Sequence, residues 1–426
     1  MIVTKVFAPK GTYDLLPEEA AAWRYLEGVI HRIFREYGYG EVRTPIFEHT
    51  ELFQRGIGET TDIVEKEMFT FTDRGERSIT LRPEGTASVV RAYLEHNIAA
   101  AGGIAKLYYY GPMFRCEAPQ AGRFRQFSQF GVEALGSSDP RVDAEVIALA
   151  VNIYRRLGIT DLEININSIG CPNCRPLYRE RLLEHLRPRV ASLCSNCQRR
   201  LERNPLRLLD CKNPGCQSLI DDIPLITETL CDDCGGHFQQ LLQYLEGIGV
   251  RFRLNPRLVR GFDYYTKTVF EVVAGDLGAQ NALCGGGRYD GLIEECGGPA
   301  TPGIGFAAGM ERLMMVLKSR DLLPRVQESP QLYLAPLGAE AQKALFPVLI
   351  QLREAGWIVE TDLLGRSLKA QLKAANKLGA PLVGVLGDDE LRNQQILIRH
   401  MDTSQQQLVP LTDLTTILAQ KFESQR

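Results

Sequence analysis

The sequence lacks any long hydrophobic run, which argues against an integral membrane protein. No stretch of about 18 consecutive apolar residues occurs, so no membrane span is predicted. The opening residues, MIVTKVFAPKG, also lack the long apolar segment of a secretion signal. We therefore expect a cytoplasmic protein that has no membrane partner.

The sequence also has little net charge, and it contains no internal repeats or low-complexity segments. Its 49 lysines and arginines nearly balance 52 aspartates and glutamates, which gives a formal net charge of -3. Such a chain has no overall attraction for nucleic acid, so any contact with RNA must come from local basic patches. Its 44% hydrophobic and 24% charged residues are typical of a globular protein. The length of 426 residues predicts roughly two to four domains.

Cysteine, in contrast, is abundant, and its spacing predicts a metal site rather than disulfides. Eight of the 11 cysteines form close pairs: Cys171/Cys174, Cys194/Cys197, Cys211/Cys216 and Cys231/Cys234. The first two pairs match the C-x2-C…C-x2-C zinc pattern, so we expect a structural zinc bound by Cys171, Cys174, Cys194 and Cys197. Eight thiolates could hold two ions, and the alternative is a set of reduced, partly buried thiols. A catalytic zinc is less expected, because it usually needs a non-cysteine ligand and an open position.

Hydrophobic periodicity predicts the secondary structure of the chain. Helices are expected over residues 17–37, 86–93, 140–156 and 302–318, the last opened by closely spaced glycines. Strands are expected over residues 42–47, 68–72, 78–81, 108–114, 125–133, 159–169, 251–255 and 269–273. After a proline-flanked linker over residues 323–330, strands and helices alternate, which predicts a separate small α/β domain.

The hairpin predicted over Tyr108–Glu133 carries an unusual set of side chains. Long polar residues, among them Arg115, Glu117, Arg123 and Gln129, stand on an aromatic framework. Guanidinium groups are planar, permanently charged forks that suit phosphate or carboxylate groups. From this stretch alone, an edge hairpin with solvated arginines is an equally good interpretation.

Three further stretches bring together polar residues and glycines. Glu84 and Thr86 lie at a predicted strand-to-helix junction, where side chains and free backbone N–H groups face a cleft. The ordinary alternative for these two residues is helix capping and a place on the surface. LVRGFDYYTKTVFE carries Arg260 followed by two adjacent tyrosines. CGGGRYD lacks the GK[ST] end of a P-loop, but its bare backbone would let a ligand lie close to it.

In their order along the chain, these stretches resemble the motifs of the histidyl-tRNA synthetase family of class II aminoacyl-tRNA synthetases. VRTPIF resembles motif 1, MFRCEAPQAGRFRQFSQFGVE resembles motif 2, and GIGFAAGMERL resembles motif 3. LRPEGT and LVRGFDYYTKTVFE are similar to the two histidine-specific stretches. The chain departs from the family pattern at Ala118, where another arginine is common, and in its clustered cysteines, which are not general to the family.

The resemblance implies a fold and an order of domains. We expect an α+β catalytic domain with a mixed, mostly antiparallel sheet, a small helical and cysteine-rich insertion, and a C-terminal α/β domain that binds the anticodon. The expected boundaries are 1–170 and 236–325 for the two parts of the catalytic core, 171–235 for the insertion and 330–426 for the last domain. Motif 1 would form a homodimer.

The resemblance also implies the reaction, which is ATP-dependent attachment of L-histidine to the 3′ end of tRNA(His) through a histidyl-adenylate. ATP would be a substrate used with Mg²⁺, and Arg115 and Arg260 would be catalytic. The residues expected to bind histidine are Glu84, Thr86, Gln129, Glu133, Tyr264 and Tyr265. Those expected to bind ATP are Arg115, Glu117, Arg123, Phe124 and Arg312. The alternative is a synthetase-like relative, the histidine-sensing regulatory subunit of ATP phosphoribosyltransferase.

Overall fold

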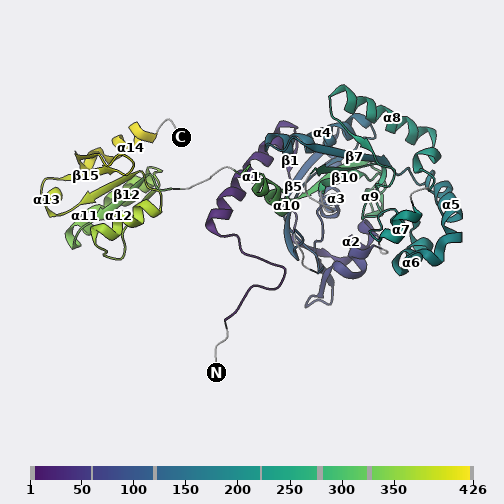
Figure 1. The fold of residues 1–426 in the computed structure, drawn as a ribbon, viewed down its shortest axis with the longest axis horizontal. Coiled ribbons are helices and arrows are strands. Elements are labelled where there is room, and N and C mark those ends of the chain that lie inside the picture. The colour runs from purple at the N-terminus through teal and green to yellow at the C-terminus, as the bar shows by residue number, and fades with distance from the viewer. Residues whose placement is uncertain are drawn as a thin grey trace. The chain divides into compact units, whose positions relative to one another are not determined.

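The computed structural model describes residues 5–58, 61–118, 122–220, 223–275, 282–323 and 329–422. Contacts within the chain divide it into two units, Met1–Arg325 and Val326–Arg426 (Figure 1). The predicted linker falls at this division, and its residues 324–328 lie outside the described ranges. None of the described helices is both long and apolar enough to cross a membrane.

The first unit is built on a mixed sheet of eight strands. In spatial order these are β1 (Gly40–Glu41), β5 (Ala105–Phe114), β6 (Gln126–Leu135), β11 (Gly303–Gly309), β10 (Ala282–Arg288), β9 (Thr266–Ala274), β7 (Leu162–Ser168) and β8 (Arg253–Leu254). Only the two edge pairs, β1 with β5 and β7 with β8, are parallel. The predicted mixed, mostly antiparallel sheet is therefore confirmed.

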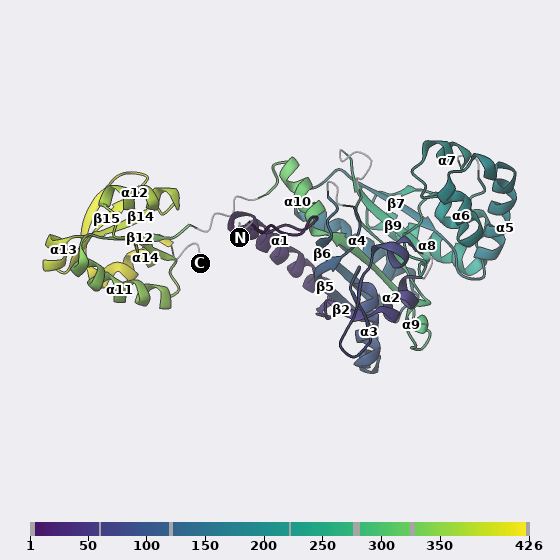
Figure 2. The same cartoon turned by 90° about the horizontal axis from the view of Figure 1, so that it is seen from below.

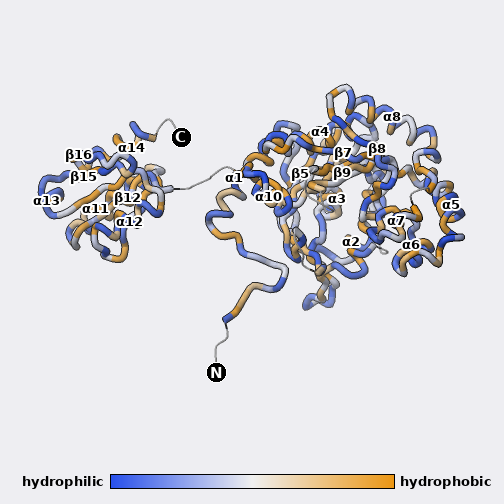
Figure 3. Tube along the Cα trace, in the orientation of Figure 1, coloured by the Kyte–Doolittle hydropathy of each residue, from blue (hydrophilic) through white to orange (hydrophobic). Residues whose placement is uncertain are grey.

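Helices on one face of this sheet enclose the main hydrophobic core. The core joins residues of α1 (Pro17–Glu36), α4 (Pro140–Arg156) and α8 (Asp232–Gly247) to alternate residues of the strands, and Figure 3 shows the central strands coloured largely as hydrophobic. In β6 the core residues are Phe130, Val132 and Ala134. Because successive side chains of a strand point to opposite faces, Gln129 and Glu133 face the other side of the sheet.

The remaining elements of the first unit, outside the cysteine-rich segment, are shorter. They are α2 (Thr50–Ile57), α3 (Thr86–Glu95), α9 (Leu292–Glu295), α10 (Met310–Ser319), the π-helical turn η1 (Ile63–Glu67), the 3-10 turn η2 (Ile98–Ala101), and a small sheet in the order β2 (Phe47–His49), β4 (Ser78–Leu81) and β3 (Phe69–Thr72). The predicted hairpin of β3 and β4 is confirmed. The helices predicted over residues 17–37, 86–93 and 140–156 are also confirmed, as α1, α3 and α4.

The prediction of a strand over residues 42–47 is wrong for residues 42–46, which form no strand. Pro45 has no N–H group to donate to a neighbouring strand. Instead, the buried guanidinium group of Arg82 donates to the carbonyl groups of Thr44, at 2.9 Å, and Pro45, at 3.3 Å. Side-chain hydrogen bonds therefore satisfy the middle of this segment, while backbone bonds from Val42 to Tyr108 and from Arg82 to Ile46 hold its two ends.

The prediction that residues 302–318 form one helix is also wrong, because residues 303–309 form β11 and the helix begins at Met310. Strand formation here depends on glycines, which have no side chain. A Cβ atom on Gly303 would collide with the ring of Tyr289, and one on Gly305 would collide with the carboxyl group of Glu133. The glycines thus admit neighbouring side chains to the surface of the sheet.

The cysteine-rich segment is helical and has its own hydrophobic cluster. It contains α5 (Arg175–Leu186), η3 (Arg187–Ser192), α6 (Ser195–Arg203), η4 (Pro205–Leu208), α7 (Pro214–Leu219) and η5 (Ile226–Thr229). Figure 2 shows α5, α6 and α7 grouped together at one end of the first unit, beyond β7 and β9. The segment lies between β7 and α8 along the chain.

The second unit is the expected α/β domain. Its sheet has the order β13 (Val359–Thr361), β12 (Leu332–Pro336), β14 (Leu382–Leu386), β15 (Gln395–His400) and β16 (Gln406–Pro410). Its helical elements are α11 (Ala339–Glu354), α12 (Leu368–Lys377), α13 (Asp388–Arg392), η7 (Leu411–Asp413) and α14 (Leu414–Phe422). β16 and α13 were not anticipated by the sequence pattern. A separate cluster of buried residues, which includes Leu345 and Ile396, forms the core of this unit.

Candidate active site

A cavity of about 250 Å³ lies against the face of the large sheet opposite the main core. It brings together residues from distant parts of the chain. The predicted site residues that line it are Glu84, Thr86, Arg115, Gln129, Glu133, Arg260, Tyr264 and Tyr265. All six residues expected to bind histidine and both arginines expected to act in catalysis therefore share one cavity.

Glu84 and Thr86 enter the cavity from the junction between β4 and α3. The Glu84 carboxylate accepts hydrogen bonds from the backbone N–H groups of Thr86, at 2.7 Å, and Ala87, at 2.8 Å. Burial raises the pKa of Glu84, while these N–H groups lower it in part. Glu84 is therefore a buried group bound to a helix N-terminus, and the interpretation of it as a surface residue is excluded.

Glu133 lies at the centre of the site, and its side chain is only 1% exposed. One of its oxygens accepts a hydrogen bond from the Thr86 hydroxyl group, at 2.7 Å, and the other accepts one from the Tyr289 hydroxyl group. Burial raises the pKa of Glu133 to about 8, although both hydroxyl groups act to lower it. Tyr289 was not among the predicted site residues. Tyr289 is the next-to-last residue of the CGGGRYD stretch. Its place directly after a glycine-rich strand was the feature of the sequence that could have indicated a site residue.

Arg260 is held from two sides. Its Nη1 atom donates to the Glu271 carboxylate, at 3.0 Å, and its backbone carbonyl accepts a hydrogen bond from Arg207 of the insertion, also at 3.0 Å. Burial acts to lower the pKa of Arg260, but the nearby Tyr265 and Glu271 outweigh it and raise that pKa. A Cβ atom on Gly285 would collide with the guanidinium group. The glycines of the CGGGRYD strand thus leave room for the side chain of Arg260.

Arg115 reaches the cavity from the loop that follows β5. Its Nε atom donates to the carbonyl group of Pro83, at 3.1 Å, and its guanidinium carbon lies 5.3 Å from the centre of the Phe127 ring. Burial lowers the pKa of Arg115, and the nearby carboxylate of Glu67 opposes this. Because a guanidinium group has five N–H donors, Arg115 keeps donors for an anion in the cavity.

Two polar atoms in the cavity wall are ready for a ligand. Within the described part of the chain, the Nε atom of Arg260 and the Oε1 atom of Gln129 are buried and have no hydrogen-bond partner. An unpaired buried donor or acceptor costs about 1–3 kcal/mol. A ligand with both an acceptor and a donor would satisfy these groups.

The other predicted ATP-binding residues do not line this cavity. Glu117 and Arg123 form an ion pair at 3.0 Å, and Phe124 lies against Tyr13 with ring centres 4.8 Å apart. Arg312 donates to the carbonyl group of Ala282 at 2.7 Å. Burial lowers the pKa of Arg312, and the positive charge of Arg123 lowers it further. Arg123 and Arg312 are therefore close enough for their charges to interact.

A larger cavity, of about 820 Å³, lies between the insertion and the segment around Arg260. It shares Arg260, Phe262 and Tyr265 with the smaller cavity, so the two adjoin. Its wall carries more basic than acidic residues. The basic residues are Arg175, Arg179, Arg187, Arg203, Arg207 and Arg260, and the acidic ones are Glu180, Glu184 and Asp263.

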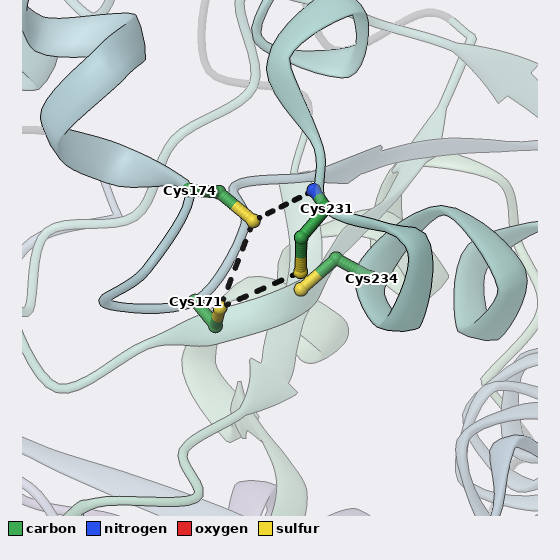
Figure 4. A group of neighbouring side chains, drawn as sticks. All are labelled: Cys171, Cys174, Cys231 and Cys234. Carbon is green, nitrogen blue, oxygen red and sulfur yellow. Dashed lines mark hydrogen bonds between the residues drawn. The ribbon is translucent and has the colours of Figure 1, made fainter.

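The cysteine pairs are grouped differently from the prediction. Cys171 and Cys174 lie with Cys231 and Cys234, as Figure 4 shows, whereas Cys194 and Cys197 lie with Cys211 and Cys216. The predicted set of Cys171, Cys174, Cys194 and Cys197 is therefore wrong. The first and last pairs meet because they stand where the chain leaves and re-enters the core, and spacing along the sequence does not reveal this.

Two family models match the chain. The model described as Histidyl-tRNA synthetase matches residues 11–173 and 223–313, and the model described as Anticodon binding domain matches residues 331–421. Most of the insertion falls between the two matched parts of the first model. The two models together cover most of the chain.

Relatives and a solved structure extend this similarity over nearly the full length. A histidine–tRNA ligase of Desulforamulus reducens is 54% identical over 410 residues, which are 96% of this chain and 98% of the relative. A histidine–tRNA ligase of Desulfitobacterium hafniense is 54% identical over 418 residues, 97% of this chain and 98% of the relative. The crystal structure of apo S. aureus histidyl-tRNA synthetase is 39% identical, with a TM-score of 0.83 over 97% of this chain and 100% of that chain. The chain therefore belongs to the histidyl-tRNA synthetase family of class II synthetases.

Proposed function

We propose that this protein is a histidine–tRNA ligase, which attaches L-histidine to the 3′ end of tRNA(His) through a histidyl-adenylate. The observation that carries the proposal is the shared cavity, in which Arg115 and Arg260 lie beside Glu84, Glu133 and the tyrosine pair. Two guanidinium groups suit a reaction between anions, and the carboxylates and tyrosines suit a polar amino acid.

In the first step, a carboxylate oxygen of histidine attacks the α-phosphate of ATP, and the bond from that phosphorus to pyrophosphate breaks. Two anions must meet, so positive charge is needed where negative charge builds up. Arg115 and Arg260 would supply this charge at the α-phosphate from opposite parts of the chain. Arg123 and Arg312 would bind the β- and γ-phosphates, whose remaining charge Mg²⁺ offsets when it is bound with the nucleotide. Glu117 and Phe124 would hold the adenine ring.

Histidine would be recognised at both ends. Its ammonium group would donate to Glu84 and to the unpaired oxygen of Gln129. Its neutral imidazole ring has one donor and one acceptor, which Glu133 and Tyr265 would meet. A pocket built for both ring nitrogens should discriminate against apolar isosteres by roughly 10⁴-fold, because its own polar groups would be left unpaired.

In the second step, a hydroxyl group of the terminal ribose of tRNA attacks the histidyl carbonyl carbon, and AMP leaves. We place the 3′ end of the tRNA in the larger, basic cavity, because it adjoins the site at Arg260 and Tyr265. Its excess of arginines would attract the phosphate backbone. The second unit would bind the anticodon.

We propose a homodimer that is formed around the motif 1 segment. Ile46, Phe47 and Phe71, on the small sheet and just before it, are 43%, 52% and 48% exposed. Two exposed phenylalanines on one small sheet, with an exposed isoleucine just before it, indicate a surface that another protein covers. The mass in solution should be near twice the 47.6 kDa of one chain, and Phe47→Glu should halve it. A monomeric wild-type protein would contradict this assembly.

The cysteine-rich insertion is proposed to bind structural zinc, as its sequence pattern predicts. Each of the two groups offers four thiols whose sulfur atoms all lie within 4.8 Å of one another. Four thiolates are the donor set of closed, structural zinc sites. Zinc would then stabilise the insertion and take no part in the reaction.

Histidine-dependent exchange of pyrophosphate into ATP tests the proposed reaction. The wild-type protein should support exchange with histidine and with no other amino acid of a panel. Arg260→Ala should reduce the exchange rate by at least about 10³-fold, because a charge at the reacting phosphorus is lost. Arg253→Ala is the control, since this exposed arginine pairs only loosely with Glu163, at 3.6 Å.

The result distinguishes the proposal from its alternative. A histidine-sensing regulatory subunit would bind histidine but would not support exchange in the wild-type protein. Near-normal exchange in the Arg260→Ala variant would exclude the role of this residue.

A further inference from the structure

We propose that the eight cysteines bind two zinc ions with different roles, and that one ion holds the tyrosine pair of the histidine cavity in place. The first site, here called the junction site, consists of Cys171, Cys174, Cys231 and Cys234. The second, here called the inner site, consists of Cys194, Cys197, Cys211 and Cys216. The ligand sets differ from those that spacing suggests, and the role of the junction site rests on the proposed function, because the cavity is taken to bind histidine.

The sulfur atoms of the junction site have the separations that a tetrahedral zinc requires. With zinc–sulfur bonds of about 2.3 Å, ligand sulfurs lie about 3.8 Å apart. The Sγ atom of Cys171 lies 3.6 Å from that of Cys174 and 3.9 Å from that of Cys231 (Figure 4). The backbone N–H group of Cys231 also donates to the sulfur of Cys174, at 3.1 Å. These separations are far longer than a disulfide bond of about 2.05 Å, so the thiols are arranged around a common centre.

The inner site has a similar arrangement. The Sγ atoms of Cys194 and Cys211 lie 4.0 Å apart. Backbone N–H groups again point at the sulfurs, from Cys194 to Cys216 at 3.2 Å and from Asn213 to Cys211 at 3.4 Å. All four ligand atoms of this group lie within 4.8 Å of one another. Both sets are complete with four thiolates, which leaves no open position for catalysis.

The junction site closes the base of the insertion. Cys174 and Cys231 are 57 positions apart in the sequence, and they stand at its two ends. A metal bound there would fix both ends of the insertion to the core. Figure 4 shows the pair from the loop after β7 facing the pair at the start of α8.

The loop of the junction site is hydrogen-bonded to the segment that carries the tyrosine pair. The N–H group of Ile169 donates to the carbonyl of Lys267, at 2.7 Å, and the N–H group of Lys267 donates to the carbonyl of Gly170, at 2.8 Å. Arg175, which directly follows Cys174, donates from its guanidinium group to the carbonyl of Tyr265. A Cβ atom on Gly170 would lie 2.9 Å from the Cβ atom of Cys174, so the loop is closely packed.

These contacts form a short path from the metal ligands to the cavity. Cys174 fixes Arg175, Arg175 binds the backbone of Tyr265, and Tyr265 lines the histidine cavity. Within the described residues, no hydrogen bond joins a cysteine of the inner site, or its neighbour in the sequence, to the tyrosine pair. The inner part of the insertion is linked to the active-site segment by bonds from Arg207 to the carbonyl of Arg260, at 3.0 Å, and from Asn204 to the carboxylate of Asp263, at 2.8 Å. Loss of the junction ion should therefore weaken histidine binding more than loss of the inner ion.

The test uses the full-length protein and two measurements, zinc content by elemental analysis and the dissociation constant for histidine by calorimetry. Wild type should contain two zinc ions per chain, and Cys234→Ser and the matched control Cys216→Ser should each contain one. Cys234→Ser should bind histidine on the order of tenfold more weakly, because small displacements of positioned groups are costly. Cys216→Ser should stay within about twofold of wild type.

The Arg175→Ala variant breaks the path to Tyr265 without removing a metal ligand. It also tests the proposal if the Cys234→Ser variant does not fold. This variant should keep two zinc ions and still bind histidine about tenfold more weakly. Wild-type affinity in Arg175→Ala or Cys234→Ser would overturn the positioning role, as would an equal loss in Cys216→Ser. Wild-type protein without zinc, in which all eight thiols react freely, would overturn both metal sites. Two zinc ions in a protein that does not bind histidine would support the metal sites and contradict the proposed function instead.

Discussion

At the scale of single residues, Glu133 shows how burial and hydrogen bonding oppose each other at one carboxyl group. Burial favours the neutral form, while the hydroxyl groups of Thr86 and Tyr289 favour the carboxylate. The balance raises the pKa from its ordinary 4.5 to about 8. In the free protein, the stability contributed by this group is therefore full below about pH 4.5 and declines as the pH rises through about 8.

Histidine binding should become tighter as the pH rises toward 8. In the proposed binding mode, the imidazole N–H group donates to an ionised Glu133, and this carboxyl group is mostly neutral at pH 7. The ionised fraction increases roughly fivefold between pH 7 and pH 8, a range in which the imidazole of free histidine is already largely neutral. The dissociation constant measured by calorimetry should fall by a similar factor.

Glu133→Gln is the control for this pH dependence. The amide cannot ionise, so the variant should bind histidine more weakly and with little change between pH 7 and pH 8. The same pH slope in this variant as in wild type would assign the titration to another group.

At the scale of secondary structure elements, a buried charged network joins α4, α8 and β10. Asp143 on α4 forms an ion pair with the fully buried Arg288 on β10 and contacts His237 on α8, at 3.0 Å. Arg288 also donates to the carbonyl of Ser137, at 2.8 Å, and to Asp290, at 3.1 Å. Burial acts to raise the pKa of Asp143, but the bond to His237 and the charge of Arg288 outweigh it and lower that pKa.

Asp143→Ala should destabilise the first unit by about 3–5 kcal/mol, because it leaves the buried charge of Arg288 with only the partly exposed Asp290 as its ion-pair partner. The midpoint of denaturant unfolding should fall accordingly. Glu340→Ala, which removes an exposed ion pair with Lys343 in the second unit, should cost less than about 1 kcal/mol. A loss below 1 kcal/mol in Asp143→Ala would show that the network is not needed for stability.

The elements that could be predicted from the sequence are those with regular hydrophobic periodicity. Helix α4 has the predicted bounds, and the hairpin of β5 and β6 places Gln129 and Glu133 on one face as its alternation requires. Elements defined by contacts far along the chain could not be predicted. The sequence of strand β11 resembles the start of a helix. The reason for its glycines becomes clear only in the structure, where the side chains of Tyr289 and Glu133 lie against them.

The same reason applies to parts of the candidate site. The motifs named eight of the residues that line the cavity, but Tyr289 was missed because its partner, Glu133, is 156 positions away. The cysteine pairs were assigned to the wrong partners, since spacing gives the type of ligand set and the fold decides which pairs meet. Motif 1 was expected to be a strand, and Arg82 changes this through side-chain bonds.

At the scale of the whole molecule, the two units divide the chain between separate hydrophobic cores. Each residue that lines the 250 Å³ cavity, where we propose that histidine binds, belongs to the first unit. The second unit matches the anticodon-binding model over residues 331–421. We therefore expect activation of histidine to depend on the first unit and recognition of the anticodon to depend on the second.

A shortened protein that ends at Leu323 should separate the two steps. It should keep histidine-dependent pyrophosphate exchange within about tenfold of wild type, because the cavity and its arginines are intact. It should lose roughly 10²-fold or more in kcat/KM for tRNA charging, which corresponds to about 3 kcal/mol of lost binding. The shortened protein needs a circular dichroism check of its fold. If it folds but exchanges no pyrophosphate, the second unit must support the cavity itself, and the division of labour between the units is wrong.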